Sequence, residues 1–163
     1  MTRPDKSTVH IQIDGAARGN PGPAGAGILL TDGNGRHLKE LAVYLGEATN
    51  NVAESIALIL ALQEALKAGR LKVFVSTDSE LLARQVTGEY RVKDRQLKWL
   101  HVLIRSLIDA MERFEIRHVP REQNRKADRL ANRAVSEGLK RKPASSRKSS
   151  PAVPDLRQPS LFG

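Results

Sequence analysis

The stretch VHIQIDGAARGNPGPAGAGILL, residues 9–30, decides the fold, and the rest of the chain is interpreted around it. It begins with strict alternation, in which Val9, Ile11 and Ile13 fall on one face, as in a half-buried β-strand. The strand is expected to end at Asp14, and a loop rich in glycine and proline follows. Because glycine has no Cβ and tolerates positive φ, such a loop can bring its backbone close to a partner. A carboxylate beside exposed amides suits a metal ion and a phosphate, although an Asp-Gly pair also suits an ordinary hairpin turn.

Length and composition place the chain in a broad class. Its 163 residues suffice for one domain with a sizeable core. It has no cysteine, which excludes disulfides and thiolate metal sites and fits a reducing compartment, so we expect a cytoplasmic location. No apolar run approaches the roughly 20 residues of a membrane span, and the first residues do not resemble a signal peptide.

The chain is strongly basic, with a formal net charge of +9. Residues 138–163 contain six bases and one acid, so just over half of this charge lies near the C-terminus. A basic surface attracts polyanions, which makes nucleic acid the leading class of partner, although surface charge also keeps a protein in solution.

Hydrophobic periodicity and turn residues predict an α/β domain. We expect strands over residues 8–14, 24–31, 37–45, 71–77 and 114–119 and helices over 52–67, 79–86, 94–113 and 124–137. An Asp-Gly-Asn-Gly hairpin joins the second and third strands, so the first three form an antiparallel meander. Helical crossovers lead to the later strands, which favours a five-stranded mixed sheet with parallel strands flanked by helices. Residues 1–7 are expected to be a loose leader, 8–137 the folded domain and 138–163 a disordered, basic Pro/Ser-rich tail.

Four acidic residues are expected to meet at one edge of this sheet. Asp14 and Asp78 end two predicted parallel strands, where ligand sites of α/β sheets form. Glu54 lies in the first turn of one helix and Asp128 in the first turns of another. Clustered carboxylates repel one another unless cations neutralise them, and all-oxygen ligation favours Mg²⁺ or Mn²⁺. Two such ions about 4 Å apart can activate a water and stabilise the leaving oxygen of a phosphodiester.

Each acid also has an ordinary structural explanation. Asp78 and Ser79 can cap a helix, and Glu54 and Asp128 can complement helix dipoles. The combined placement of all four favours a metal site over separate structural roles.

Four sequence blocks resemble a known family. IDGAARGNPGPAGAG, TNNVAES, STDSELLARQ and HVPREQNRKADRLAN are similar to the motif blocks of type 1 ribonuclease H, in its short, reverse-transcriptase-like branch of bacteria and archaea. The resemblance runs from about residue 10 to residue 135, so residues 8–137 would be the catalytic domain. It implies a ribonuclease H-like fold. It also implies an endonuclease that uses two divalent ions to hydrolyse the RNA strand of RNA/DNA hybrids, leaving 5′-phosphate and 3′-hydroxyl ends.

The same resemblance assigns roles to individual residues. It implies that the catalytic, metal-binding carboxylates are Asp14, Glu54, Asp78 and Asp128, and that Glu54 also accepts a hydrogen bond from the ribose 2′-hydroxyl. The positions expected to lie against the hybrid are Gly15, Asn20, Asn50, Asn51, Ser79 and Asn124. Amide side chains suit this task because they can both donate to and accept from a 2′-hydroxyl.

Two features of the family's longer members are expected to be missing. His118 has the spacing of their loop histidine, ten residues before Asp128, but it falls in a predicted strand. The basic helical protrusion of longer members is absent between residues 85 and 97. Tyr90 and Trp99 remain near this position and could pack against the DNA strand, whereas the alternative for Trp99 is a place in the core.

The C-terminus carries a second resemblance. Gln158, Leu161 and Phe162 belong to the sequence QPSLF, which is similar to the short sliding-clamp-binding peptide of bacterial replication proteins, although so short a match also arises by chance. A flexible basic tether would raise the local concentration of the enzyme at replicating DNA. We therefore expect a monomer whose partners are RNA/DNA hybrid and, through the tail, the DNA sliding clamp.

Two other functions are compatible with the sequence. One is a non-catalytic hybrid- or duplex-binding module on the same fold, which would have no need of a self-repelling carboxylate cluster. The other is a related metal nuclease with a different nucleic-acid substrate, and the asparagines expected to contact a 2′-hydroxyl argue against it.

Overall fold

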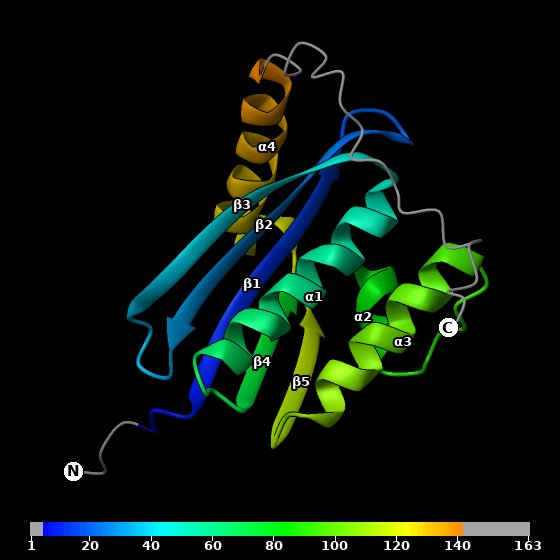
Figure 1. The fold of residues 1–163 in the computed structure, drawn as a ribbon. Coiled ribbons are helices and arrows are strands. Elements are labelled where there is room, and N and C mark those ends of the chain that lie inside the picture. The colour runs from blue at the N-terminus through cyan, green and yellow to red at the C-terminus, as the bar shows by residue number, and fades with distance from the viewer. Residues whose placement is uncertain (1–4, 142–163) are drawn as a thin grey trace, which may run out of the picture.

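The fold is a five-stranded sheet with helices on both faces, seen in a computed structural model that describes residues 5–141 (Figure 1). The strand order is β3-β2-β1-β4-β5. Helix α1 packs on one face with α3 beside it, and α4 packs on the opposite face (Figure 1). The elements are β1 (Thr8–Ala17), β2 (Gly22–Asp32), β3 (His37–Ala48), α1 (Asn50–Lys67), β4 (Lys72–Thr77), α2 (Glu80–Val86), α3 (Arg95–Asp109), β5 (Arg113–His118), the 3₁₀ turn η1 (Arg121–Gln123) and α4 (Arg125–Lys140).

The sheet is mixed, as the sequence predicts. Strands β1, β2 and β3 pair antiparallel, whereas β4 pairs parallel with both β1 and β5. The parallel pairing of β1 with β4 ends at Ile13 and Thr77. The next residue on each strand is an aspartate, Asp14 or Asp78, so the topology brings these two side chains to the same edge.

The glycine-rich loop expected after Asp14 is shorter than predicted, because strands extend into it from both sides. Strand β1 continues to Ala17, paired with β2 alone, and β2 already begins at Gly22. Gly25 and Gly27 lie in β2 beneath α4, where an added Cβ would come within 2.6 Å and 2.2 Å of backbone oxygens of α4. These two glycines therefore allow a helix to pack closely on the sheet, and their role is internal rather than an approach to a partner.

Helix α1 forms the centre of the core. It is buried nearly all round, because one side packs on β1 and β2 and another on α3. The largest fully buried side chains of this core include Ile11, Ile28, Leu58, Leu62 and Ile104. Close packing continues to the beginning of α1, where an added Cβ on Gly15 would lie 2.3 Å from the backbone nitrogen of Glu54. Glu54 can therefore lie this close to β1 only because residue 15 is a glycine and has no side chain.

Local capping chemistry sets most helix boundaries. Thr49, Ser79 and Asp94 each accept a hydrogen bond from a backbone N–H three residues further on, which starts α1, α2 and α3. Gly69 has a φ of 65°, as expected of a residue that ends a helix. The helix expected over residues 94–113 ends earlier, at Asp109, because residues from 113 onward pair with β4 instead. Helix α4 runs past the expected end at residue 137 to Lys140.

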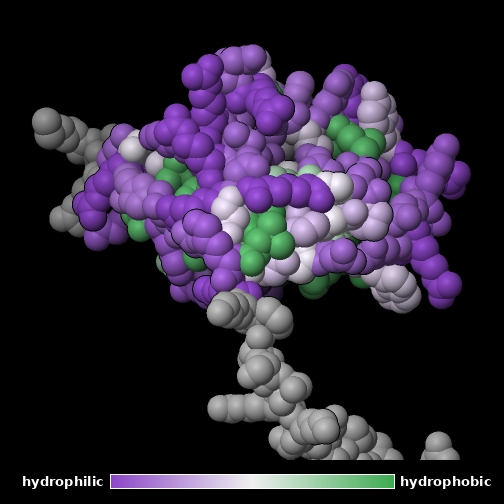
Figure 2. Space-filling view, turned by 90° about the horizontal axis from the view of Figure 1, so that it is seen from above, coloured by the Kyte–Doolittle hydropathy of each residue, from purple (hydrophilic) through white to green (hydrophobic). Residues whose placement is uncertain are grey.

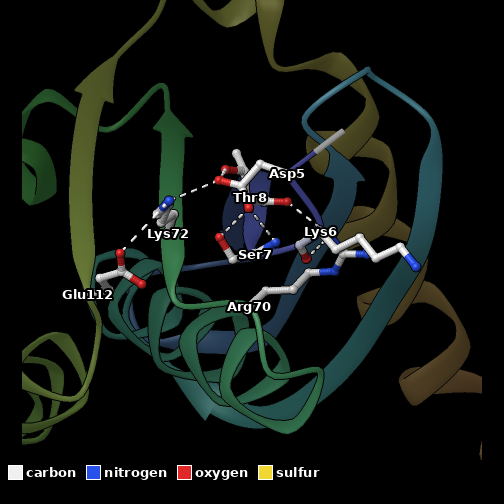
Figure 3. Close-up of polar contacts among 7 residues, drawn as sticks. All are labelled: Asp5, Lys6, Ser7, Thr8, Arg70, Lys72 and Glu112. Atoms are coloured by element: carbon white, nitrogen blue, oxygen red, sulfur yellow. Dashed lines mark hydrogen bonds and ion pairs between the residues drawn. The ribbon is translucent and has the colours of Figure 1, made fainter. Parts of the chain in front are cut away.

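The N-terminal segment is held more firmly than the loose leader expected from the sequence (Figure 3). Asp5 accepts hydrogen bonds from Ser7 and Thr8 and pairs with Lys72 at 3.0 Å. The Arg70 guanidinium donates to the carbonyl oxygens of residues 6 and 8. Bonds from Ser7 and then Lys72 hold the pKa of the Asp5 carboxyl well below its usual range. Residues 5–7 therefore belong to the folded domain.

The predicted tail falls almost wholly outside the described residues. Gln158, Leu161 and Phe162 lie in the undescribed part of the chain, so the clamp-binding expectation stays a prediction. Across residues 5–141, no helix is both long and apolar enough to cross a membrane.

Candidate active site

The four carboxylates predicted from the sequence come together in one pocket. It has a volume of about 270 Å³ and is lined by Asp14, Glu54, Asp78, Asp128, Gly15, Asn50, Arg121 and Asn132. Asp14 lies on β1 and Asp78 directly follows β4, while α1 supplies Glu54 and α4 supplies Asp128. The side of the molecule toward which these strands run is predominantly hydrophilic (Figure 2).

The electrostatics of the pocket favour cations. Asp14 is only 7% exposed, and burial raises the pKa of its carboxyl to about 8, with further contributions from the negative charges of Asp78, Asp128 and Glu54. Burial also raises the pKa of Glu54 to about 7, although a hydrogen bond with Ser79 acts in the opposite direction. The raised pKa of both carboxyls has one physical cause: burial and neighbouring negative charge disfavour the ionised form, and a bound cation would relieve both.

Neighbouring polar groups orient the outer carboxylates. The Asn50 amide donates to Glu54 Oε1 at 3.1 Å, one helical turn away on α1. Asn132 Nδ2 donates to Asp128 Oδ1 at 3.2 Å, and the Arg121 guanidinium lies 3.5 Å from the same oxygen. The sequence reasoning missed Asn132, although its position four residues after Asp128 places it on the same helix face.

The chemical type of the four side chains suits hard divalent cations. All four side chains offer carboxylate oxygens, which Mg²⁺ and Mn²⁺ prefer. The Asp14 and Asp128 carboxyls are close enough to share a hydrogen bond. Within residues 5–141, however, no three His, Asp or Glu side chains are arranged as a ready metal-binding cluster. The residues thus fit such ions by chemistry and proximity, and binding would require the carboxylates to turn toward a common point.

The residues expected to lie against a hybrid divide into three groups. Asn20, Asn50 and Asn51 are exposed near the pocket, and Asn20 Oδ1 accepts a hydrogen bond from the Asn50 backbone at 3.2 Å. Gly15 and Ser79 border the carboxylates, with Ser79 also capping α2. Asn124, by contrast, is fully buried, so as placed it has no surface for contact with a substrate.

The positions expected to differ from longer family members are also resolved. His118 is exposed and is the last residue of β5, in agreement with its prediction as a strand residue. Trp99 is 70% exposed on α3, which rules out the alternative that it belongs to the core. Tyr90 is 45% exposed and lies beneath the guanidinium of Arg84. Both aromatic rings are therefore available at the surface.

Comparison with known proteins identifies the family. The model of the reverse transcriptase-like family matches residues 12–134. Ribonuclease HI of Halobacterium salinarum is 41% identical over 138 residues, which cover 84% of this chain and 69% of that protein. The chain belongs to the type 1 ribonuclease H family. The sequence-based resemblance, the ribonuclease H-like fold and the class of ribonuclease H enzyme are thereby confirmed.

Solved ribonuclease H structures superpose closely on this chain. Ribonuclease H1 of H. salinarum has a TM-score of 0.78 at 42% identity, covering 80% of this chain and 98% of its own. LC11-RNase H1, isolated from compost, has a TM-score of 0.78 at 43% identity, covering 82% of this chain and 99% of its own, and it has also been crystallised with an RNA/DNA hybrid. The N-terminal ribonuclease H domain of a Mycobacterium tuberculosis protein has a TM-score of 0.76 at 41% identity, covering 78% of this chain and 98% of its own. That mycobacterial protein is bifunctional, and the match spans 35% of its length.

Proposed function

We propose that this ribonuclease H cleaves the RNA strand of RNA/DNA hybrids internally and leaves 5′-phosphate and 3′-hydroxyl ends. The observation that carries the proposal is the buried Asp14 carboxylate surrounded by three further acids in an open pocket. A module that only binds nucleic acid gains nothing from such a cluster, because its negative charge repels phosphates. The hybrid bound to LC11-RNase H1 supports the choice of substrate, as does the net charge of +9.

Asp14, Glu54, Asp78 and Asp128 would hold two Mg²⁺ or Mn²⁺ ions. When bound, such a pair supplies Lewis acidity for the phosphate and lowers the pKa of the attacking water. The protein's own task is to present four deprotonated carboxylates in fixed orientations. Asn50 restrains Glu54, and Asn132 with Arg121 restrains Asp128.

Recognition of the RNA strand would use the exposed amides beside the pocket. The hydrogen bond between Asn20 and the Asn50 backbone ties the β1–β2 connection to the start of α1. It keeps two amide-bearing residues at one edge, where they can contact the minor groove of a hybrid. Because an amide both donates and accepts, it can bond to a 2′-hydroxyl in either sense, and that hydroxyl distinguishes RNA from DNA.

The DNA strand would lie across the beginning of α3. Trp99 is exposed there, and the exposed bases Arg95 and Lys98 flank it in sequence. Basic side chains neutralise backbone phosphates, and an exposed indole can pack against a sugar or a base. This short surface would take the place of the longer members' basic protrusion.

We further propose that the enzyme acts as a monomer in the cytoplasm and that its QPSLF terminus binds the DNA sliding clamp. The absence of cysteine supports a reducing compartment. The terminal peptide lies beyond the described residues, so its support is the sequence resemblance alone.

A substrate panel tests the activity. Labelled RNA/DNA hybrid, double-stranded RNA, double-stranded DNA and single-stranded RNA are each incubated with Mg²⁺, Mn²⁺ or EDTA, and end groups are determined from product ladders. We expect cleavage of the RNA strand in the hybrid with either ion, 5′-phosphate ends and no cleavage in EDTA. Binding without cleavage would favour the non-catalytic module, and preferential cleavage of another duplex would favour the related nuclease.

A further inference from the structure

Helix α4 begins differently from the other three α-helices. Thr49, Ser79 and Asp94 each use a side-chain oxygen to cap the helix that follows. Asn124 occupies the same position before α4, and asparagine is among the best capping residues, yet its side chain makes no capping hydrogen bond. Its side chain points into the protein instead and is fully buried. The exception occurs at the helix that carries Asp128.

The buried amide reaches two acceptors at the active site. Asn124 Nδ2 donates to the Ile13 carbonyl oxygen at 2.8 Å and to Asp78 Oδ1 at 3.1 Å. Since both partners are acceptors, only the nitrogen end of the amide can face them. The oxygen end, Asn124 Oδ1, is buried without a hydrogen-bond partner among the described residues. An unused cap and an unpaired carbonyl both cost stability, so this orientation gives up local stability at the start of α4 in exchange for the two contacts of the amide nitrogen.

Asn124 connects the three elements that carry the aspartates. Ile13 precedes Asp14 on β1, and Asp78 follows β4. The Asn124 carbonyl oxygen also accepts the backbone N–H of Asp128 at 3.1 Å. A single neutral residue therefore links the backbone of β1, the carboxylate that follows β4 and the first turn of α4.

We propose that Asn124 is a positioning residue whose hydrogen bond restrains the Asp78 carboxylate at the pocket, so that metal affinity depends on it, and that it is not a contact of the hybrid. This proposal rests on the proposed function only in taking the carboxylates as ion ligands. The role requires a hydrogen-bond donor at the end of a side chain as long as that of asparagine. Serine is too short to reach both acceptors, and aspartate, which has the same shape, presents an acceptor to two acceptors.

The test compares Asn124→Ser and Asn124→Asp with wild type and with Asn34→Ser, a matched change at the exposed turn between β2 and β3. The first measurement omits nucleic acid: thermal midpoints are recorded across a titration of Mg²⁺ and of Mn²⁺. The second is kcat and KM on labelled hybrid at saturating metal. We expect half-maximal stabilisation of both Asn124 variants to require a metal concentration at least roughly 10-fold higher than for wild type. A loss of this size is usual when a residue that hydrogen-bonds to a metal ligand is removed. We also expect kcat to fall while KM stays within about two-fold, and Asn34→Ser to match wild type.

Several results would overturn the proposal. An unchanged metal titration in both variants would show that the amide does not position a ligand. A raised KM with an unchanged kcat would restore the hybrid contact expected from the sequence. Failure of both variants to fold in metal-free buffer would assign Asn124 a purely structural role. If wild type binds metal but does not cleave hybrids, the proposed function fails while the metal titration still decides the role of Asn124.

Discussion

Replacing Asp14 by asparagine removes a carboxylate that is buried and is surrounded by three other negatively charged side chains. We expect Asp14→Asn to abolish cleavage and, at the same time, to stabilise the metal-free protein at alkaline pH. The reason is that burial and charge repulsion raise the pKa of the Asp14 carboxyl from 3.8 to about 8 in the folded protein. An acid whose pKa is higher in the folded than in the unfolded protein stabilises the folded state fully at a pH below its unfolded-state pKa. This stabilisation is lost as the pH rises through its folded-state pKa. Wild type should therefore lose stability between about pH 4 and pH 8.

The magnitude follows from the size of the shift. A change from 3.8 to about 8 is close to four units, and each unit corresponds to about 1.4 kcal/mol, which gives a ceiling of about 6 kcal/mol. Because the four acids share protons, removal of one charge also relaxes the others, and the observable gain is smaller, about 2–4 kcal/mol. For a chain of this size such a gain raises the melting temperature by roughly 5–15 °C.

Differential scanning calorimetry of both proteins in EDTA, from about pH 4 to pH 9, measures the difference directly. We expect equal melting temperatures at the acid end and a variant that is increasingly the more stable one above about pH 6. Saturating Mg²⁺ should close part of the gap by stabilising wild type alone. A variant that is less stable than wild type at about pH 8, or one with the same pH profile, would refute the electrostatic reasoning.

Three further predictions follow from single positions. Gly27→Ala should lower the free energy of unfolding by about 2–4 kcal/mol, because the added Cβ would lie 2.2 Å from a backbone oxygen of α4. Gly33→Ala, whose added Cβ has no neighbour nearer than 3.6 Å, should change it by less than about 0.5 kcal/mol. Urea titrations measure both values, and equal effects would contradict the packing argument. Trp99→Ala should leave the melting temperature unchanged and raise KM for the hybrid roughly 3- to 10-fold, and an unaltered KM would remove α3 from the substrate surface. The double change Leu161→Ala with Phe162→Ala should abolish capture by immobilised sliding clamp without affecting hybrid cleavage, and undiminished capture would end the clamp proposal.

Many features of the active site could be predicted from the sequence because the signals are local. The alternation of Val9, Ile11 and Ile13 indicates a strand, and two aspartates placed where the pairing of two parallel strands ends must reach the same edge. Four acids in ordered motif blocks then predict one pocket, and the structure brings all four together.

Other features depend on partners that are distant in the sequence. Asn124 looks like a capping residue or a substrate contact until β1 and β4 supply the acceptors that draw its amide inward. Gly25 and Gly27 fall in a predicted strand, but the reason for glycine at these positions emerges only when α4, about a hundred positions later, packs against them.

The sequence by itself therefore predicted the order of the strands, the turns, the convergence of four acids and the family, since periodicity, turn chemistry and motif spacing are short-range properties of the chain. Only the tertiary structure decided the extension of β1, the burial of Asn124, the exposure of Trp99 and the attachment of residues 5–7. Each of these depends on which distant backbone or charge lies opposite the residue, and that neighbour exists only once the sheet and its helices have assembled.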